Sequence, residues 1–136
     1  MLRTTVRKRP FTITGIDRSD YMAKDSERAI AFYRDVLGLE LQSLAPDNSG
    51  GEFELADGST FGLWVSSDAA MPFQPSNGVL FAVDDLEAAA SALEARGIAI
   101  ITRLETPVCN MALINDTEGN VVTLHKRKTA AHRPPA

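Results

Sequence analysis

The sequence predicts an α+β fold of two tandem βαβββ modules, with the helices outside and a central cleft between two sheets. Three matching pairs of punctuation residues predict the repeat: Asp25 and Asp85 before helical patterns, Gly38 and Gly97 after them, and the turns Asp57-Gly58 and Glu118-Gly119. Their offsets are 60, 59 and 61 residues, so independent signals share one period of about 60 residues. One helix can cover only one face of a four-stranded sheet, so we expect the two sheets to curl around a shared cleft.

The first half of the chain shows each element of a module in order. Phe11 to Ala23 begins as an alternating strand, and Asp25 follows at the N-cap position of a helix. That helix spans Ser26 to Leu37, where apolar residues recur at helical spacing, and Gly38 ends it as a left-handed cap. The other expected elements are a strand over Leu39 to Leu44, a loop over Ala45 to Gly51, and a hairpin of Glu52 to Ala56 and Thr60 to Ser66.

The second half repeats this order after a linker. Residues 67–77 hold two prolines and no periodic pattern, so they separate a first module (11–66) from a second (78–127) within one domain, 11–127. The expected elements are a strand over Gly78 to Val83, a helix between Asp85 and Gly97, and strands over Ile98 to Arg103, Val108 to Ile114 and Val121 to Lys126. We predict a basic arm over residues 1–10 and a disordered tail over 128–136.

Charge and composition exclude several classes of protein. The net charge of −4 is uneven, because eight of the 14 basic residues lie before position 10 or after position 125, and all 18 acidic residues lie between Asp17 and Glu118. The acidic middle of the chain would repel nucleic acid, and no apolar run is long enough to cross a membrane. Cys109 is the only cysteine and cannot form an internal disulfide, which favours a cytoplasmic location.

Three phrases carry a resemblance to a known family. The segments "DSERAIAFYRDVLGLEL", "VDDLEAAASALEARGI" and "NDTEGNVVTLH" make residues 11 to 127 similar to the vicinal oxygen chelate superfamily, which includes glyoxalases, extradiol dioxygenases, fosfomycin-modifying enzymes and bleomycin-binding resistance proteins. The resemblance implies an open, mostly antiparallel eight-stranded half-barrel and a homodimer with clefts at or near the subunit interface. It implies no single activity, because lyases, oxygenases, transferases and plain binders share this scaffold.

Metal-dependent members take their ligands from the first strand and the last hairpin strand of each half. The resemblance maps these positions onto Arg18, Gly78, Gly62 and Thr123, where histidine or glutamate would be needed. A Lewis-acid metal needs about three imidazole, thiolate or carboxylate ligands, so we expect no metal and no cofactor. The alternative is a displaced metal site built from His125, Glu52 or Glu54.

The two hairpins supply candidate side chains for a cleft. Strand alternation puts Thr123 and His125 on one face, where the imidazole would act as a general base or hydrogen-bond a ligand. The other interpretation is an idle histidine at the rim. By the repeat offset His125 corresponds to Trp64, whose indole beside Gly62 would form a flat wall for a planar ligand. Trp64 would otherwise fill the cleft or contact a dimer partner.

Further candidates lie on the first strand and on the strand after Pro107. Arg18 offers a guanidinium for a carboxylate or phosphate, unless it forms an internal ion pair with Asp20 on the same strand face. Met22 continues that face and would give an adaptable apolar contact. Cys109 and Asn110 must point to opposite faces of their strand, so Asn110 would contact a ligand only if it is the one that points inward. We expect Cys109 to be buried and unreactive.

We therefore predict a protein that binds a small aromatic or anionic molecule in its cleft without a metal. The predicted ligand-binding residues are Arg18, Asp20, Met22, Trp64, Asn110 and Thr123, and the candidate catalytic residue is His125. The alternatives are a lyase or dioxygenase with a relocated metal, a metal-independent isomerase that uses His125 as its base, and an interaction domain whose cleft is filled.

Overall fold

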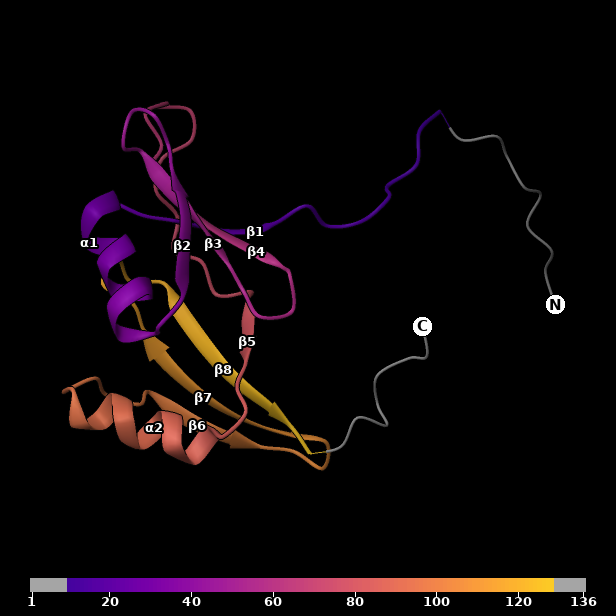
Figure 1. Ribbon diagram of the computed structural model, residues 1–136, viewed down its shortest axis with the longest axis vertical. Coiled ribbons are helices and arrows are strands. Elements are labelled where there is room, and N and C mark those ends of the chain that lie inside the picture. The colour runs from indigo at the N-terminus through magenta and orange to yellow at the C-terminus, as the bar shows by residue number, and fades with distance from the viewer. Residues whose placement is uncertain (1–9, 129–136) are drawn as a thin grey trace, which may run out of the picture.

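The computed structural model describes residues 10–128, which form two four-stranded sheets and two helices (Figure 1). Sheet A has the strand order β1-β4-β3-β2 and sheet B the order β5-β8-β7-β6. In each sheet the first strand pairs in parallel with the last, and the other pairs are antiparallel. The strands are β1 (Ser19–Met22), β2 (Glu40–Leu44), β3 (Gly50–Glu54), β4 (Thr60–Trp64), β5 (Leu80–Ala82), β6 (Thr102–Glu105), β7 (Cys109–Asn115) and β8 (Val121–Arg127). The predicted α+β fold with two open βαβββ modules is confirmed.

Both helices begin and end where the sequence predicts. Helix α1 (Ser26–Ala31) is capped by Asp25, whose carboxylate accepts a hydrogen bond from the backbone N–H of Arg28 at 3.0 Å. Helix α2 (Leu86–Ala95) is capped in the same way by Asp85. The glycines at 38, 58, 97 and 119 all have φ between 74° and 90°, a backbone conformation that side chains disfavour. The last turn of the first helix is a π-helix, η1 (Phe32–Val36), which the sequence pattern did not predict.

Two strands begin four or more residues later than predicted, and β3 begins two residues earlier, inside the loop expected over Ala45 to Gly51. The strand expected over Phe11 to Ala23 is only β1, because its partner β4 begins at Thr60 and leaves earlier residues nothing to pair with. The strand expected over Ile98 to Arg103 is instead β6, four residues later. Ile98 and Ile100 pack against the hydrophobic core, so their apolar spacing reflects a connection below α2 and not a sheet strand.

The core joins the two modules. Each helix covers one face of its own sheet, and the buried side chains of both modules form one cluster. Tyr33 lies at its centre, with its ring 5.0 Å from that of Phe61 in β4 and 6.4 Å from that of Phe81 in β5. These tilted aromatic contacts add to the free energy gained by burial and hold η1 against the second module.

A buried polar latch also ties the β7–β8 turn to α1. The Glu118 carboxylate accepts hydrogen bonds from the backbone N–H groups of Lys24 and Asp25, both at 2.8 Å, and from the Arg28 guanidinium at 2.7 Å. Burial alone would raise the pKa of Glu118, but these hydrogen bonds lower it from 4.5 to about 2. The Tyr33 hydroxyl donates to Asp116 at 2.8 Å, and its pKa is raised by burial and by that neighbouring carboxylate. The two modules therefore meet in one fixed arrangement.

The chain that precedes β1 runs away from both sheets (Figure 1). Phe11, Ile13 and Ile16 are between 72% and 86% exposed, which is unusual for three large apolar side chains so close together. The predicted basic arm (1–10) and disordered tail (128–136) lie, except for Pro10 and Lys128, outside the described residues. Among residues 10–128, neither helix is long and apolar enough to span a membrane.

Candidate functional site

The face of sheet A that points away from α1 gathers four of the predicted residues. The register pairs Asp20 with Gly62 and Met22 with Trp64 across β1 and β4, so their side chains point to the same side of the sheet. Glu52 in β3 is opposite Gly62 and shares this face. Arg18, just before β1, reaches over the same surface. We call this surface the open face of sheet A.

Arg18 forms an internal ion-pair network on this face. Its Nε lies 3.0 Å from Oδ1 of Asp20, and its Nη1 lies 3.3 Å from Oε2 of Glu52. The charge of Asp20 is the main reason that the pKa of Arg18 is raised. Gly62 leaves room for this arrangement, because a Cβ at that position would lie 2.5 Å from Oδ1 of Asp20. The ion pair of Arg18 with Asp20, which the sequence left as an alternative, is therefore present. The guanidinium also pairs with a second carboxylate, that of Glu52.

Trp64 lies beside this network. Its half-buried side chain and Arg18 line a cavity of about 360 Å³ together with Glu52 and with Ser43 of β2. Small-molecule sites are usually concave, with an apolar wall and a few fixed polar groups, and this cavity has both. An aromatic ring seated here would contact the indole and the Arg18 network at once.

The corresponding face of sheet B has a different character. Thr123, buried in β8, is opposite Leu80 of β5 and Leu113 of β7, while His125 is opposite Ala82 and Met111. Opposite residues share a face, so the surroundings of Thr123 and His125 are mostly apolar. Leu80, Leu104 and Val108 are each between 44% and 50% exposed. We call this surface the open face of sheet B.

His125 lies in a cavity of about 660 Å³ between the two modules. Asp57 and Thr60 of the β3–β4 hairpin line it from the first module, and Cys109 and Arg127 line it from the second. The cavity lies beside the hairpin turn of the first module, and this turn differs in its contacts from the corresponding turn of the second module. Glu118 in the second hairpin turn bonds to the start of α1, whereas its counterpart Asp57 is an exposed residue that lines the cavity.

Asn110 is not on the face that carries His125. Cys109 is opposite Arg127 and therefore shares the face of His125, so Asn110 points to the opposite side of sheet B. There it lines a cavity of about 300 Å³ beside α2, with Glu87 and Arg103. Its buried Oδ1 accepts no hydrogen bond from the described residues. The sequence left open which of Cys109 and Asn110 points inward, and the register selects Cys109.

The side chains present do not fit a divalent metal of the kind that the family uses. The four mapped positions hold Arg18, Gly62, Gly78 and Thr123, which offer no imidazole, thiolate or carboxylate. Within residues 10–128, no three histidine, cysteine, aspartate or glutamate side chains lie close enough to hold a metal ion. Of the displaced ligands considered, Glu52 is engaged by Arg18 on sheet A, while His125 belongs to sheet B.

The latch residues Asp116, Glu118 and Asn120 were missed by sequence reasoning, which treated them only as a turn. Asn120 donates from Nδ2 to the carbonyl of Met22 at 2.8 Å, and so holds the end of β1. An aspartate, a glutamate and an asparagine around a turn glycine are common in solvent-exposed turns, so the sequence carries no signal of their burial.

Comparisons with solved structures give the same fold. The chain is similar to TnmS3, an antibiotic binding protein from Streptomyces sp. CB03234, with 27% identity over 87% of this chain and 99% of that one and a TM-score of 0.70. It is also similar in fold to a lactoylglutathione lyase from Agrobacterium tumefaciens, with 24% identity, coverage of 85% and 95% and a TM-score of 0.70. A glyoxalase/dioxygenase from Nostoc punctiforme shares the fold at 14% identity, with coverage of 93% and 100% and a TM-score of 0.70.

The family itself is identified by sequence. No curated protein sequence matches the chain significantly. Residues 15–124, however, match the family model of the Glyoxalase/Bleomycin resistance protein/Dioxygenase superfamily, and this span covers most of both modules. The chain therefore belongs to the glyoxalase/bleomycin resistance protein/dioxygenase superfamily.

Proposed function

We propose that this protein binds a small aromatic molecule in a cleft whose wall is the open face of sheet A, and that it does so without a divalent metal. The observation that carries the proposal is the half-buried indole of Trp64 in a concave site beside a fixed Arg18, Asp20 and Glu52 network. The antibiotic-binding neighbour from Streptomyces, at 27% identity, supports binding as a function of this fold. The cytoplasmic location expected from the single cysteine is part of this proposal.

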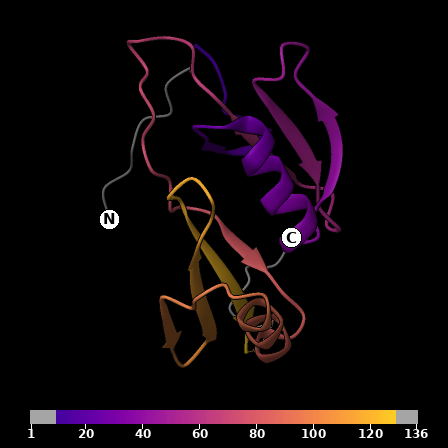
Figure 2. The ribbon, with the colours of Figure 1, turned by 90° about the vertical axis from the view of Figure 1, so that its left-hand side faces the viewer.

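The second wall of the cleft would come from a second copy of the chain. In Figure 2, α1 lies between the strands of sheet A and those of sheet B, so the part of the open face around Trp64 is turned away from the second module, and only Thr60, at the start of β4, lines a cavity with residues of sheet B. The open face of sheet B carries the exposed side chains of Leu80 and Leu104, an apolar surface of the kind that another protein surface usually buries. In a homodimer each open face of sheet A would meet the open face of sheet B of the other copy, which would bring Trp64 near Thr123 and His125.

Each residue has a distinct role in this proposal. Trp64 stacks on the ligand, and Met22, which adjoins it across β1 and β4, adapts to the ligand's shape. Thr123 and His125 of the second copy donate or accept hydrogen bonds. Asn110 would contribute only through its own cavity beside α2.

The charges of the site favour a neutral or cationic ring over an anionic one. Arg18 is shared between Asp20 and Glu52, so an anionic ligand would have to displace a carboxylate that is already in place. The register also puts Glu54 and Glu40 on this face, which makes the surface negative overall. Of the two ligand classes predicted from the sequence, the aromatic one is supported and the anionic one is not.

A matched set of naphthalene compounds tests this ligand class. Trp64 is the only tryptophan in the sequence, so quenching of its fluorescence reports directly on the site. We expect 2-naphthol and 2-naphthylmethylammonium to quench the fluorescence and 2-naphthoate to bind at least fivefold more weakly. Equal binding of all three compounds would argue against the role given to the carboxylates.

We expect Trp64→Ala to weaken 2-naphthol binding about tenfold, because stacking on an aromatic wall contributes about 1 kcal/mol beyond simple burial. Trp64→Phe should retain affinity within about threefold, since it keeps an aromatic face. Isothermal titration calorimetry measures both variants without relying on the indole. Unchanged affinity in Trp64→Ala would mean that the indole is structural.

Native mass spectrometry of protein purified without a chelator would separately report bound metal and subunit number.

A further inference from the structure

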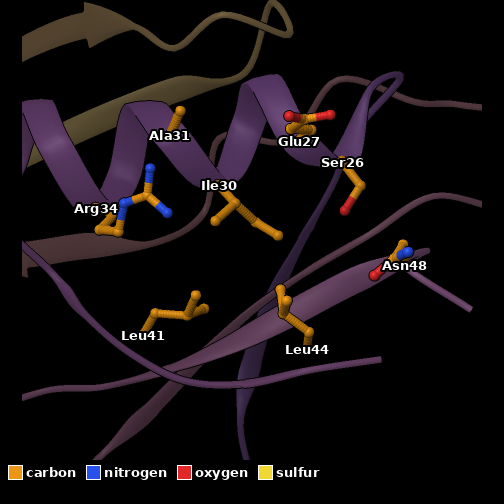
Figure 3. A pocket seen from close by; sticks show the side chains of 8 residues that line it. All are labelled: Ser26, Glu27, Ile30, Ala31, Arg34, Leu41, Leu44 and Asn48. Atoms are coloured by element: carbon orange, nitrogen blue, oxygen red, sulfur yellow. The ribbon is translucent and has the colours of Figure 1, made fainter. Parts of the chain in front are cut away.

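A second concave site lies on the opposite side of sheet A from Trp64. Figure 3 shows this groove between the first helix, α1 with η1, and strand β2; its volume is about 470 Å³. Ile30 points from the helix toward Leu41 and Leu44, and these three side chains form an apolar floor. Arg34 lies at one end of the groove, and Glu27 and Asn48 lie at the other. Trp64 does not line this groove, but Leu44 borders both the groove and the cavity beside Trp64, so the two sites meet at the edge of sheet A.

The groove exists because the sequence removes side chains and bends the backbone around it. Leu44 pairs with Gly51, and a Cβ at Gly51 would lie only 3.2 Å from the terminal methyls of Ile30 and Leu41, so the floor has no room for another side chain. The helix widens into a π-turn beside the groove, with Leu37 N–H bonded to the Phe32 carbonyl at 3.1 Å. Such turns are rare and occur often at functional sites.

The three floor residues differ in exposure, because Ile30 belongs to the buried core, at 5% exposed, and Leu41 is half-buried. Leu44 is 53% exposed although it faces Ile30 across the groove. At the rim, Asn48 has a φ of 60°, a left-handed conformation that asparagine adopts in turns. The exposed apolar surface of the groove is therefore mainly that of Leu44.

The two ends of the groove carry opposite charges. Arg34 is held by a two-point ion pair with Asp35, in which Nε and Nη2 lie 2.8 and 2.9 Å from the carboxylate oxygens; the pair has no net charge, so an anion would be met by Nη1 alone. Glu27 lies seven residues earlier, about two helical turns or roughly 10 Å along the axis. A ligand that matches the groove would have an apolar middle, an anion near Arg34 and a cation near Glu27.

We propose that this groove binds short apolar peptides with free ends, of about three residues. An extended tripeptide spans about 10 Å, which matches the separation of the two charges. Its ammonium would pair with Glu27, its carboxylate with Arg34, and an apolar side chain would pack on Ile30 and Leu44. The irregular pairing at Gln42 interrupts the edge of β2, so recognition would rest on the peptide's ends and not on an added strand.

The repeat provides a natural comparison. The residues that correspond to Glu27 and Arg34 at an offset of 60 are Glu87 and Glu94. The second module thus keeps the acidic residue, which is paired with Arg103 of β6, but has no basic residue at the matching helix position. Glu87→Gln is a matched control for Glu27→Gln, because both replace an exposed glutamate in the first turn of a helix.

Titration of the full-length protein with leucyl-alanyl-leucine, followed by methyl NMR, tests the proposal. We expect the methyl signals of Ile30, Leu41 and Leu44 to shift, with a dissociation constant between about 0.1 and 1 mM for such a shallow site. The fluorescence of Trp64 should not change, because it lies on the other side of the sheet. The same peptide with an acetylated amine and an amidated carboxylate should bind at least tenfold more weakly.

Charge removal at either end gives the second arm of the test. We expect Arg34→Gln and Glu27→Gln each to weaken binding about five- to tenfold, because each removes one charge-assisted contact, whereas Glu87→Gln should leave binding unchanged. Equal binding of the blocked peptide, or an absence of methyl shifts, would overturn the proposal. Shifts of the same methyls that follow protein concentration without peptide would also overturn it, because they would assign the groove to a second copy of the chain. None of these outcomes bears on binding at Trp64.

Discussion

Replacement of Glu118 by glutamine is expected to lower the free energy of unfolding by about 3 kcal/mol at pH 7. Glu118 is only 2% exposed, and its carboxylate accepts from two backbone N–H groups and from Arg28. Glutamine is similar in size but neutral, so it cannot compensate the Arg28 guanidinium, and it brings a donor where the site needs an acceptor. Chemical denaturation monitored by circular dichroism gives this difference directly.

The same carboxylate should make the protein sensitive to acid. The pKa of Glu118 is lowered to about 2 in the folded state from an ordinary value of 4.5. A group with a lowered pKa stabilises the fold fully above its unfolded pKa, and the contribution is lost as the pH falls toward its folded pKa. The difference in stability between the wild type and Glu118→Gln should therefore be constant above about pH 5 and shrink between about pH 4.5 and 2.

Glu94→Gln is the control for this comparison. Glu94 is an exposed glutamate on α2, so its replacement should change stability by less than about 0.5 kcal/mol at any of these pH values. A Glu118→Gln variant as stable as Glu94→Gln would show that the latch contributes nothing to the joint between modules. A stability difference that persists unchanged to pH 2 would mean that the loss comes from packing and not from charge.

The elements that the sequence predicted well are those set by local chemistry. Asp25 and Asp85 cap their helices through their own side chains, and the turn glycines at 58 and 119 adopt positive φ for reasons contained in a few residues. The internal pair of Arg18 and Asp20 was also foreseen, because two residues on one strand face are neighbours whatever the rest of the chain does.

The features that the sequence could not predict depend on distant partners. Glu118 bonds to residues more than 90 positions away, so nothing near it in the sequence marks it as buried. The first strand is short because its parallel partner β4 begins only at Thr60, which no residue between Phe11 and Arg18 encodes. Strand alternation predicts which sheet face carries Trp64 and which carries His125. The orientation of the two sheets relative to each other depends on how the core joins the modules, so alternation does not predict it.

Leu104→Glu is expected to convert the proposed homodimer into a monomer, with a dimer dissociation constant at least 100-fold higher. Leu104 is 46% exposed on the open face of sheet B, which carries Leu80 and Met111 nearby and would meet sheet A of the second copy. Sheet A offers Glu52 and Asp20 there, so a new carboxylate would be buried against like charges as well as apolar groups.

Ile101→Glu is the matched control, because Ile101 is a similarly exposed aliphatic residue, 49% exposed, that lies just before β6 and does not line the cavity beside Trp64. Analytical ultracentrifugation over a range of protein concentrations should show a dimer for the wild type and for Ile101→Glu, and a monomer for Leu104→Glu. Monomeric Leu104→Glu should also bind 2-naphthol less tightly, since the cleft would lose its second wall while the wall containing Trp64 remains intact. If Leu104→Glu stays dimeric, sheet B does not form the interface, and Thr123 and His125 cannot reach a ligand held at Trp64 in the way proposed.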